Sequence, residues 1–549
     1  MTNNNRPYLN YRLLYIPIAF LFILSFVNCA KKGTPSGGVR DTIPPVIVRS
    51  IPENFSTNFS GNEIEIRFNE YIKLKDINQQ LIISPPMKYR PVITPLSTAK
   101  SLKIKIIDTL EPNTTYSFNF GKSIVDNNEG NEFKYFKYVF STGSYIDSLT
   151  VSGRVRDAKL VAPEIPTTVM LYKMDGNFKD SLVYSAKPTY ITVTADTTGV
   201  FELTNLKQGK YRLIALNEKG SDYTFQPKTD KIGYVNDPVY VPTDSLYTIT
   251  LFKETPGYKL ARPAQVGNNH IIFGFEGEAD SLKIDLLSDK PSDFKTIVYK
   301  DEIKDTLNYW YKPAIALDSL VFKVANGKVV DTVTLRMKAL YTDSLKISAV
   351  KTGTLKLRDT FKLRANTPIL SFAPEKFRVM TRDSLVLEPA VTLNTKYNIT
   401  EISFPKKEEE IYSISIMPGA LTDFFDHTND SLTFKINTRS ASEYGTLQLH
   451  LVNVDRYPLI VQMVDSKFDV VASKIIPKPL EGEKAKSEVT FEEIAPAKYY
   501  LRIIYDDNAN GRWDTGNFLN RVKPEKILYY PSIIEIRANW NLNETFILK

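Results

Sequence analysis

The chain has 549 residues, of which 42% are hydrophobic, 12% aromatic and 24% charged. This is the composition of an ordinary folded protein, and the length is sufficient for about three to five domains. The formal net charge is +8, with Lys and Glu interspersed along the chain, which does not favour a nucleic-acid-binding protein. A single cysteine excludes an internal disulfide.

The N-terminus has the organisation of a signal peptide followed by a tether. Two arginines precede an apolar stretch, Leu13–Val27, which is shorter than the about 20 residues that a transmembrane helix needs. The single cysteine, Cys29, follows, and after it comes a segment rich in Gly, Pro, Ser and Lys that is too polar to pack. We therefore predict a signal peptide at 1–28 and a tether at 29–40.

This layout resembles that of a bacterial lipoprotein, in which the cysteine thiol receives diacylglycerol and becomes the mature N-terminus. The resemblance implies that Cys29 is lipidated and that acyl chains hold the protein at a membrane, each buried CH₂ contributing about 0.8 kcal/mol. Phe26 and Asn28 depart from the usual cleavage box, which has Leu and a small residue at these places. A signal peptide cut elsewhere, with a free thiol at Cys29, is the alternative.

Residues 41–144 have the pattern of a β-sandwich. Runs such as EIEIRF (63–68) and SLKIKII (101–107) alternate apolar and polar side chains, so that one face of each strand is buried. The domain resembles the bacterial Ig-like domain of Bacteroidota lipoproteins, and the resemblance implies a fold and a cell-envelope location but no reaction. The segments that carry the resemblance are DTIPPVIVRSIPENFSTN (41–58), LEPNTTYSFNFGKSIVDNNEGN (110–131) and YVFSTG (138–143).

Residues 145–254 are expected to form a sandwich of a second type. The segment DTTGVFELTNLKQGKYRLIAL (196–216) places a tight turn before one strand and a Gly-x-Tyr at the start of the next. It resembles the transthyretin-like or carboxypeptidase-regulatory sandwich. A β-domain of unclear type is expected at 255–364.

The end of the chain looks like a second copy of this pair of domains. YSISIMPGALTDFFDHTNDSLTFKINT (412–438) has the pattern of the Ig-like segment, and VTFEEIAPAKYYLRIIYDDNANG (489–511) has that of the transthyretin-like segment. We therefore predict a second Ig-like β-domain at 365–440 and a second transthyretin-like β-sandwich at 441–549. The predicted fold class is all-β, with tandem Ig-like and transthyretin-like sandwiches and an internal duplication of the pair.

The sequence does not favour an enzyme. Its three histidines, His270, His427 and His450, lie far apart and form no HExxH or HxH pattern. No nucleophile elbow, phosphate loop or dinucleotide fingerprint is present. A lipidated Cys29 cannot serve as a nucleophile, so a pair of carboxylates in a glycosidase-like cleft is the remaining catalytic alternative.

The segment DDNANGRWDTGN (506–517) is the candidate metal site, and no other cofactor is expected. Asp, Asn and Asn at alternating positions before a glycine form the first half of a D-x-N-x-N-G calcium loop. A bidentate Glu belongs at the twelfth position, which here is Asn517, so an Asx-rich turn capped by Trp513 is the alternative. The candidate residues of a structural calcium site are Asp506, Asn508, Asn510, Arg512 and Asp514.

The triplet Asp-Ser-Leu occurs eight times, and five related triplets begin with Asp-Thr, where ordinary composition predicts roughly two in all. Asp-Ser and Asp-Thr favour turns in which the side chain bonds to the backbone before a strand. The triplets also resemble the acceptor of periplasmic O-glycosylation in the Bacteroidota. That resemblance makes the following residues O-glycosylation candidates: Thr42, Thr109, Ser148, Ser181, Thr197, Ser245, Ser281, Thr306, Ser319, Thr332, Ser344, Ser384 and Ser431.

These patterns and resemblances predict a non-enzymatic outer-membrane lipoprotein whose stacked sandwiches form a scaffold or interaction subunit. The expected partners are the membrane, through the lipid anchor, and another envelope protein, such as an outer-membrane β-barrel complex for assembly, export or uptake. Nucleic acid is not an expected partner. The choice between cell surface and periplasmic face stays open, because Lys31 and Lys32 stand where surface lipoproteins carry acidic residues.

Two alternative functions remain. A glycan-binding surface module would use exposed aromatic side chains, for which the candidates are Trp310, Tyr311 and Trp513. A calcium-dependent adhesin would use the loop at 506–517.

Overall fold

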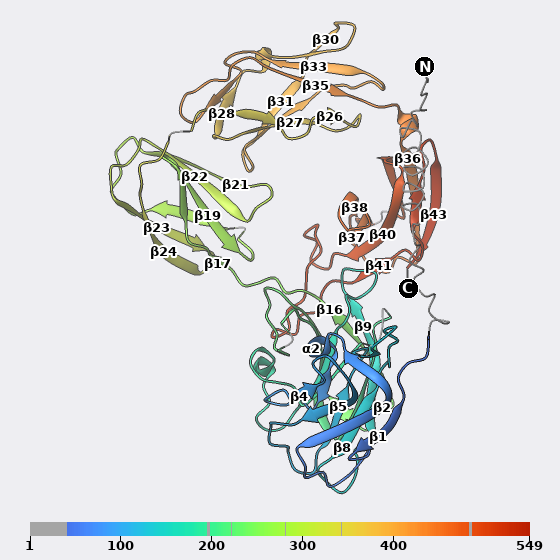
Figure 1. Ribbon diagram of the computed structural model, residues 1–549. Helices are drawn as coiled ribbons and strands as arrows, with labels where there is room; N and C mark the ends of the chain where they lie inside the picture. The colour runs from blue at the N-terminus through green and yellow to red at the C-terminus, as the bar shows by residue number, and fades with distance from the viewer. Residues whose placement is uncertain are drawn as a thin grey trace, which may run out of the picture. The chain divides into compact units, whose positions relative to one another are not determined.

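The structure is a computed structural model that describes residues 41–194, 198–220, 222–279, 281–341, 343–481 and 486–548. The predicted signal peptide, the tether and Cys29 lie outside the described residues. The chain divides into two compact units, the first containing residues 41–81 and Met87–Tyr145, and the second containing Ile82–Pro86 and everything after Ile146. Figure 1 labels the elements along the chain.

The first unit is a sandwich built on alternating strands. β1, β2, β5 and β4 form one sheet in that order, β7 pairs with β2, and β6 pairs with β8. Alternate residues of β2 are buried, among them Ile64 and Ile66, and they share the interior with Phe118 and Phe140. The elements are β1 (Ile47–Ile51), β2 (Glu63–Leu74), α2 (Ile77–Gln80), β4 (Val92–Thr94), β5 (Thr98–Lys105), β6 (Thr115–Asn119), β7 (Ile124–Asp126) and β8 (Lys137–Ser141).

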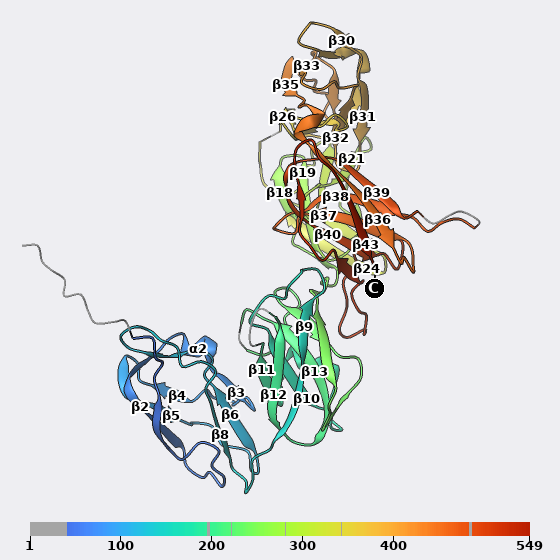
Figure 2. The ribbon, with the colours of Figure 1, turned by 90° about the vertical axis from the view of Figure 1, so that its right-hand side faces the viewer.

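The second sandwich spans Leu149–Leu251. One sheet has the order β11-β10-β13-β14, with β15 on β13, and the other has the order β12-β9-β16, in which β16 runs parallel to β9; Figure 2 shows β9 to β13. Its strands are β9 (Leu149–Asp157), β10 (Thr168–Lys173), β11 (Tyr190–Val193), β12 (Val200–Leu206), β13 (Gly209–Asn217), β14 (Lys231–Tyr234), β15 (Val239–Val241) and β16 (Leu246–Leu251).

The fifth sandwich, Gly445–Ile547, repeats this topology strand for strand. Its sheets have the orders β38-β37-β40-β41, with β42 on β40, and β39-β36-β43, and β43 again runs parallel to β36. The correspondence extends over eight strands, so the two sandwiches have the same topology. The strands are β36 (Gly445–Val452), β37 (Leu459–Val464), β38 (Val470–Ile476), β39 (Glu488–Ile494), β40 (Ala497–Tyr505), β41 (Ile527–Tyr529), β42 (Ile534–Ile536) and β43 (Asn541–Ile547).

The third sandwich spans Lys259–Arg336, within the segment whose fold type the sequence left unclear. One sheet has the order β17-β19-β22-β21, with β18 on β19, and the other has the order β20-β23-β24. Phe273, Tyr309 and Phe322 meet edge to face in its core. The strands are β17 (Lys259–Leu260), β18 (Ala264–Gly267), β19 (His270–Glu276), β20 (Lys283–Leu286), β21 (Lys295–Lys300), β22 (Thr306–Lys312), β23 (Ser319–Asn326) and β24 (Val329–Arg336).

The fourth sandwich, Ile347–Asn437, repeats the Ig-like order of the first unit. The sheet β25-β27-β32-β31 corresponds to β1-β2-β5-β4, the pair β28-β34 to β2-β7, and the pair β33-β35 to β6-β8. The strands are β25 (Ile347–Ala349), β26 (Gly353–Thr354), β27 (Phe361–Ala365), β28 (Ile369–Phe372), β29 (Phe377–Met380), β30 (Val386–Leu387), β31 (Ala390–Asn394), β32 (Ile399–Ser403), β33 (Ile411–Ile416), β34 (Leu421–Asp423) and β35 (Leu432–Asn437).

This sandwich begins earlier than the predicted division between residues 364 and 365. β25, β26 and β27 precede or cross that point, yet they pair with later strands of the same sandwich, and Phe361 and Leu363 are in its core. The fourth sandwich lacks the DTIPP segment that marks the start of the first Ig-like domain. Nothing in the sequence therefore indicated that its short first strands belong to it.

The described elements are strands and short helices, the latter α2 and the 3-10 turns Asp180–Tyr184, Pro374–Lys376 and Ala441–Glu443. The prediction of an all-β chain of tandem sandwiches is confirmed. Over the part of the chain that is described, none of the helices combines the length and the apolar character needed to cross a membrane.

Candidate functional site

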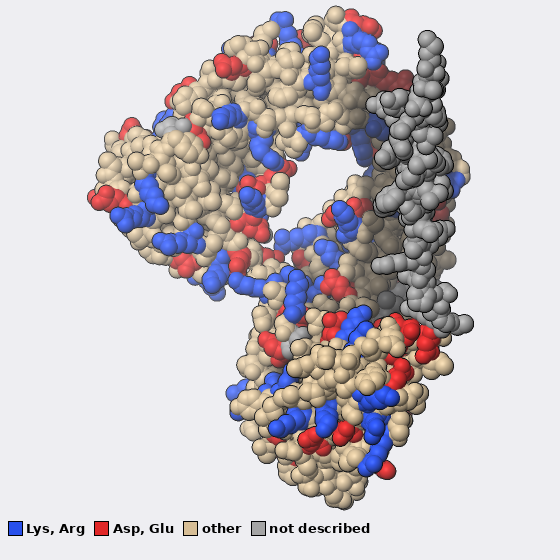
Figure 3. Space-filling view, in the orientation of Figure 1, with Lys and Arg blue, Asp and Glu red and all other residues tan. Residues whose placement is uncertain are grey.

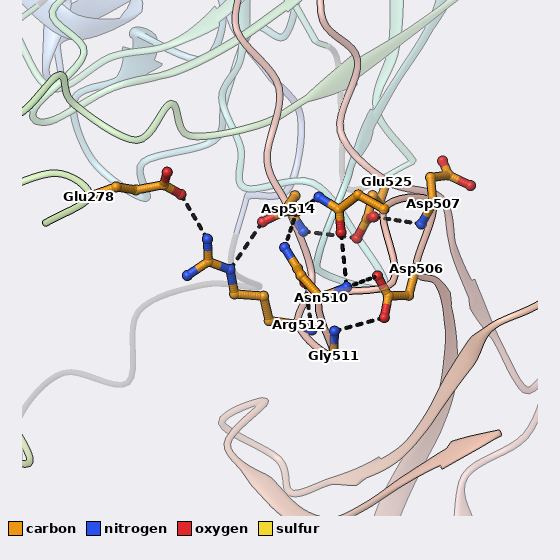
Figure 4. Close-up of polar contacts among 9 residues, drawn as sticks. Glu278, Asp506, Asp507, Asn510, Gly511, Arg512, Asp514 and Glu525 are labelled. Atoms are coloured by element: carbon orange, nitrogen blue, oxygen red, sulfur yellow. Dashed lines mark hydrogen bonds and ion pairs between the residues drawn. The ribbon is translucent and has the colours of Figure 1, made fainter. Parts of the chain in front are cut away.

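The candidate metal loop connects β40 to β41 in the fifth sandwich (Figure 4). The buried Asp506 carboxylate accepts hydrogen bonds from the backbone N–H groups of Asn510, at 3.0 Å, and Gly511, at 2.8 Å. Gly511 has a φ of +77°, which side chains other than glycine rarely adopt. Asp506 therefore caps a tight turn with both of its oxygens.

The remaining candidate side chains bond to one another. The amide nitrogens of Asn508 and Asn510 lie 2.5 Å and 2.6 Å from one oxygen of Asp514. Arg512 approaches the other Asp514 oxygen at 3.4 Å and reaches across to Glu278 at 3.0 Å (Figure 4). The side-chain oxygens of the loop are therefore already hydrogen-bonded or ion-paired to other residues of the protein.

Glu525 is the residue of this loop that the sequence analysis missed. Its two carboxylate oxygens accept from the backbone N–H of Asp507, at 2.8 Å, and of Asp514, at 2.9 Å. Its backbone carbonyl accepts from Trp513 Nε1 at 3.0 Å. Burial raises the pKa of Glu525, although these backbone hydrogen bonds act in the opposite direction. Glu525 lies eleven residues after Asp514. Its side chain thus connects the start of the loop, at Asp507, to the part near Asp514.

The corresponding loop of the second sandwich has the same cap without the same oxygens. Glu218, directly after β13, accepts from the N–H groups of the fourth and fifth residues after it, Asp222 and Tyr223, at 3.1 Å and 3.0 Å. Gly220 and Gln226 stand at the positions that correspond to Asn508 and Asp514. Because the cap forms in both copies, the loop geometry supports the Asx-turn interpretation of 506–517. Among the described residues, no group of three or more His, Cys, Asp or Glu side chains is placed to hold a metal ion.

Two of the three aromatics named for the alternative glycan-binding function are buried and present no exposed platform for a sugar. Trp310 and Tyr311 are each 1% exposed. The Trp310 ring stacks on His270 at 3.8 Å and meets Phe425 edge-on at 5.9 Å. Their strand, β22, lies between β19 and β21, and both of its faces are packed.

The third aromatic candidate, Trp513, is half-buried. Besides its hydrogen bond to Glu525, its ring lies against the apolar cluster of the second sandwich, and the Lys159 ammonium is 5.6 Å from the ring centroid. Trp513 therefore packs between the second and fifth sandwiches.

The histidines are distributed over three sandwiches. Burial lowers the pKa of His270 to about 4, and its Nε2 lies 2.9 Å from Asn308 Oδ1. His427 pairs with Asp423 in the fourth sandwich, and His450 pairs with Glu488 in the fifth. The structure brings no two of them into one site.

The glycosylation candidates are accessible wherever they are described. Thr306 is half-buried, and Thr197 lies outside the described residues. Asp41 forms the expected turn, its carboxylate accepting from the N–H of Ile43 at 2.9 Å. Glycosylation stays a prediction. The exposed candidates are Thr42, Thr109, Ser148, Ser181, Ser245, Ser281, Ser319, Thr332, Ser344, Ser384 and Ser431.

The sequence predicted that the sandwiches stack, but it did not predict which residues join the second sandwich to the fifth. Phe518, beyond the candidate metal loop, is completely buried in the apolar cluster that contains Tyr234 and Phe252. Arg521 forms an ion pair with Asp180. Only the local Asx pattern of 506–517 was visible in the sequence, and no pattern there identifies a partner so distant in the chain.

Comparison with known proteins identifies one domain. Residues 41–142 match the family model of the Bacterial Ig-like domain, which confirms the Ig-like prediction for this segment. No curated protein matches the chain.

The similarity to solved structures is weak. Domains 1–6 of the surface layer protein SbsC are 12% identical, with a TM-score of 0.17 over 90% of this chain and 67% of that chain. A Salmonella alpha-2-macroglobulin reacted with methylamine is 11% identical, with a TM-score of 0.14 over 86% of this chain and 44% of that chain.

Proposed function

We propose that this chain, with its Bacterial Ig-like domain and four further sandwiches, is a non-enzymatic interaction scaffold of the bacterial outer membrane. In this proposal it is anchored through Cys29 and serves as a subunit of an envelope protein complex, of the kind built around an outer-membrane β-barrel. The observation that carries the proposal is the contact between the second and fifth sandwiches. A chain whose distant domains bind one another holds its surfaces in a defined arrangement while that contact is closed, as a scaffold requires.

The charged side chains on the surface are mixed in sign. On the face drawn in Figure 3, Lys and Arg side chains are interspersed with Asp and Glu, and neither sign forms a continuous patch. Such a surface keeps a protein soluble and does not single out a polyanion as ligand. Loops and sheet edges are the surfaces that such a scaffold offers to a protein partner.

The anchor rests on the sequence pattern around Cys29 alone. Its role is to hold the sandwiches near a membrane partner, which raises the local concentration of the two proteins. The Bacterial Ig-like match agrees with a cell-envelope location but reports on residues 41–142 only.

Co-purification from native membranes tests this function. The tagged wild type and a Cys29→Ser variant, which has no thiol to lipidate, are expressed in the native host, solubilised in mild detergent and captured. We expect mass spectrometry to recover the same envelope protein repeatedly with the wild type and to lose it with the variant. Recovery of the wild type alone, or equal recovery of the partner with both, would contradict the proposal.

A further inference from the structure

The connection between β40 and β41 ends in a small hairpin, residues 517–522, which we call the latch hairpin. Asn517 and Val522 exchange two backbone hydrogen bonds of 2.9 Å each. The Asn517 side chain also accepts from the N–H of Asn520 at 2.9 Å. These bonds shape the docked hairpin from within and present Phe518 and Arg521 to the second sandwich.

The apolar centre of the docked hairpin is Phe518. Its ring meets Tyr234 edge-on, with centroids 5.3 Å apart at 71°, and it shares the apolar cluster with Phe252. Aromatic rings favour this arrangement because the partly positive edge of one ring is attracted to the partly negative face of the other.

Backbone and polar contacts surround this centre. The N–H of Phe518 donates to a Glu254 carboxylate oxygen at 2.5 Å, and the Tyr234 hydroxyl donates to the Val522 carbonyl at 3.2 Å. Thr515 Oγ1 donates to the Lys253 carbonyl at 2.6 Å. The docked hairpin is therefore hydrogen-bonded to two separate segments of the second sandwich.

The charges in this contact are poorly balanced. Arg521 pairs with Asp180, which already has Arg212 Nε at 3.5 Å. Arg521 Nη1 is buried without a hydrogen bond to any described residue. Burial lowers the pKa of Lys523 to about 8, and repulsion from Arg521 and Arg212 adds to the effect. Burying mutually repelling cations opposes docking. Lys523 Nζ compensates in part, because it donates to the Tyr234 carbonyl at 2.6 Å and lies 3.5 Å from the Tyr234 ring centroid, so the cations limit the strength of the contact without preventing it.

Two ion pairs of the described residues join the fifth sandwich to its other neighbours, and both are weak. Arg512 pairs with Glu278 of the third sandwich, and Arg358, within the fourth sandwich, pairs with Glu492. All four side chains are exposed, and exposed ion pairs contribute little. The chain itself joins the second sandwich to the fifth only through the third and fourth, so undocking breaks no strand pairing within any sandwich.

We propose that the latch hairpin is a reversible latch, which opens and closes the contact between the second and fifth sandwiches while every sandwich stays folded. Phe518 closes it, and the crowded cations around Asp180 limit its strength. Opening uncovers the apolar cluster around Tyr234 and Phe252 and frees the fifth sandwich to move on its connection to the fourth. The proposal concerns the chain alone and does not depend on the membrane partner.

Hydrogen–deuterium exchange of the purified full chain tests the latch. The readout compares a peptide covering 513–523 with one covering 499–505 in β40, both of which contain hydrogen-bonded amides. We expect the latch peptide to exchange at least about tenfold faster than the β40 peptide, through local opening, yet more slowly than a free chain. Equal protection of both peptides would make the contact a permanent part of the fold. Exchange at the free-chain rate would mean that the hairpin is not docked.

Two variants separate the latch from general loosening. Phe518→Ala removes the apolar centre, and we expect it to increase opening of the latch peptide by about a hundredfold while leaving the β40 peptide unchanged. Leu519→Ala, in the same hairpin but with an exposed side chain, is the matched control and should leave both peptides unchanged. A Phe518→Ala variant with unchanged latch exchange, or a Leu519→Ala variant with an equal increase, would overturn the proposal.

Discussion

The Arg521 guanidinium lies against the Asp180 carboxylate, although 341 positions separate the two residues in the chain. Asp180 also has Arg212 Nε of its own sandwich at 3.5 Å, but the pair with Arg521 forms only because the second and fifth sandwiches meet. The four predictions below test the packing and the loops on which this arrangement depends.

Gly516 is required for the connection that carries the latch hairpin. A Cβ atom at this position would lie 2.7 Å from the Val522 carbonyl oxygen and 2.9 Å from the ring of Phe252. We expect Gly516→Ala to lower stability by about 1–3 kcal/mol through overpacking, measured by chemical denaturation. Gly176→Ala is the control, because nothing lies within 4 Å of its Cβ position. Equal midpoints for both variants would refute the close approach.

The loop at 506–517 is expected to behave as a turn. Since its side-chain oxygens already bond within the protein, millimolar calcium should leave the melting temperature of the wild type unchanged. Asp506→Asn should lower the melting temperature with or without calcium, because the stronger carboxylate cap is lost. If calcium raises the melting temperature and Asp514→Asn abolishes the increase, the loop is a calcium site.

Glu218 makes stability depend on pH. Burial raises its pKa to about 7, and nearby Asp222 contributes in the same direction. The folded state therefore favours the protonated carboxyl, so this contribution to stability is complete below the ordinary pKa of about 4.5 and is lost as the pH rises through 7. Glu218→Gln, which keeps an acceptor oxygen, should be more stable than the wild type at pH 8 and similar to it at pH 4.5. Thermal melting at the two pH values measures this, and parallel pH profiles would contradict it.

Trp310 is expected to be a core residue. Trp310→Ala should cost about 3–5 kcal/mol because it leaves a cavity beside His270 and Phe425. Trp540, which is 54% exposed, provides the control, and Trp540→Ala should change stability by less than about 0.5 kcal/mol. Denaturant titration gives both values. A stable Trp310→Ala variant that loses glycan binding would restore the glycan-binding hypothesis.

Local periodicity was sufficient to predict most of the fold. Alternation in EIEIRF and SLKIKII correctly indicated β2 and β5, because each strand buries one face. The internal duplication was visible for the same reason, since equivalent strands keep their buried positions and equivalent loops keep their capping carboxylates, as at Glu218 and Asp506.

The errors and omissions concern contacts between segments distant in sequence. Trp310 was retained as a candidate for the alternative glycan-binding function because nothing local shows that β22 is packed on both faces. Glu525 was missed because it lies beyond the 506–517 motif, 11 residues after Asp514 in the same connection, where the calcium-loop spacing assigns no residue. The pairing of Arg521 with Asp180 depends on the arrangement of whole sandwiches, which strand patterns do not encode.

Cross-linking mass spectrometry on intact native cells tests the scaffold proposal most directly, because it reports the partner and the arrangement of the sandwiches in one measurement. We predict links between lysines of the second and fifth sandwiches within the chain, together with recurrent links to one outer-membrane protein. Links confined to neighbouring sandwiches, with no recurrent envelope partner, would contradict the account.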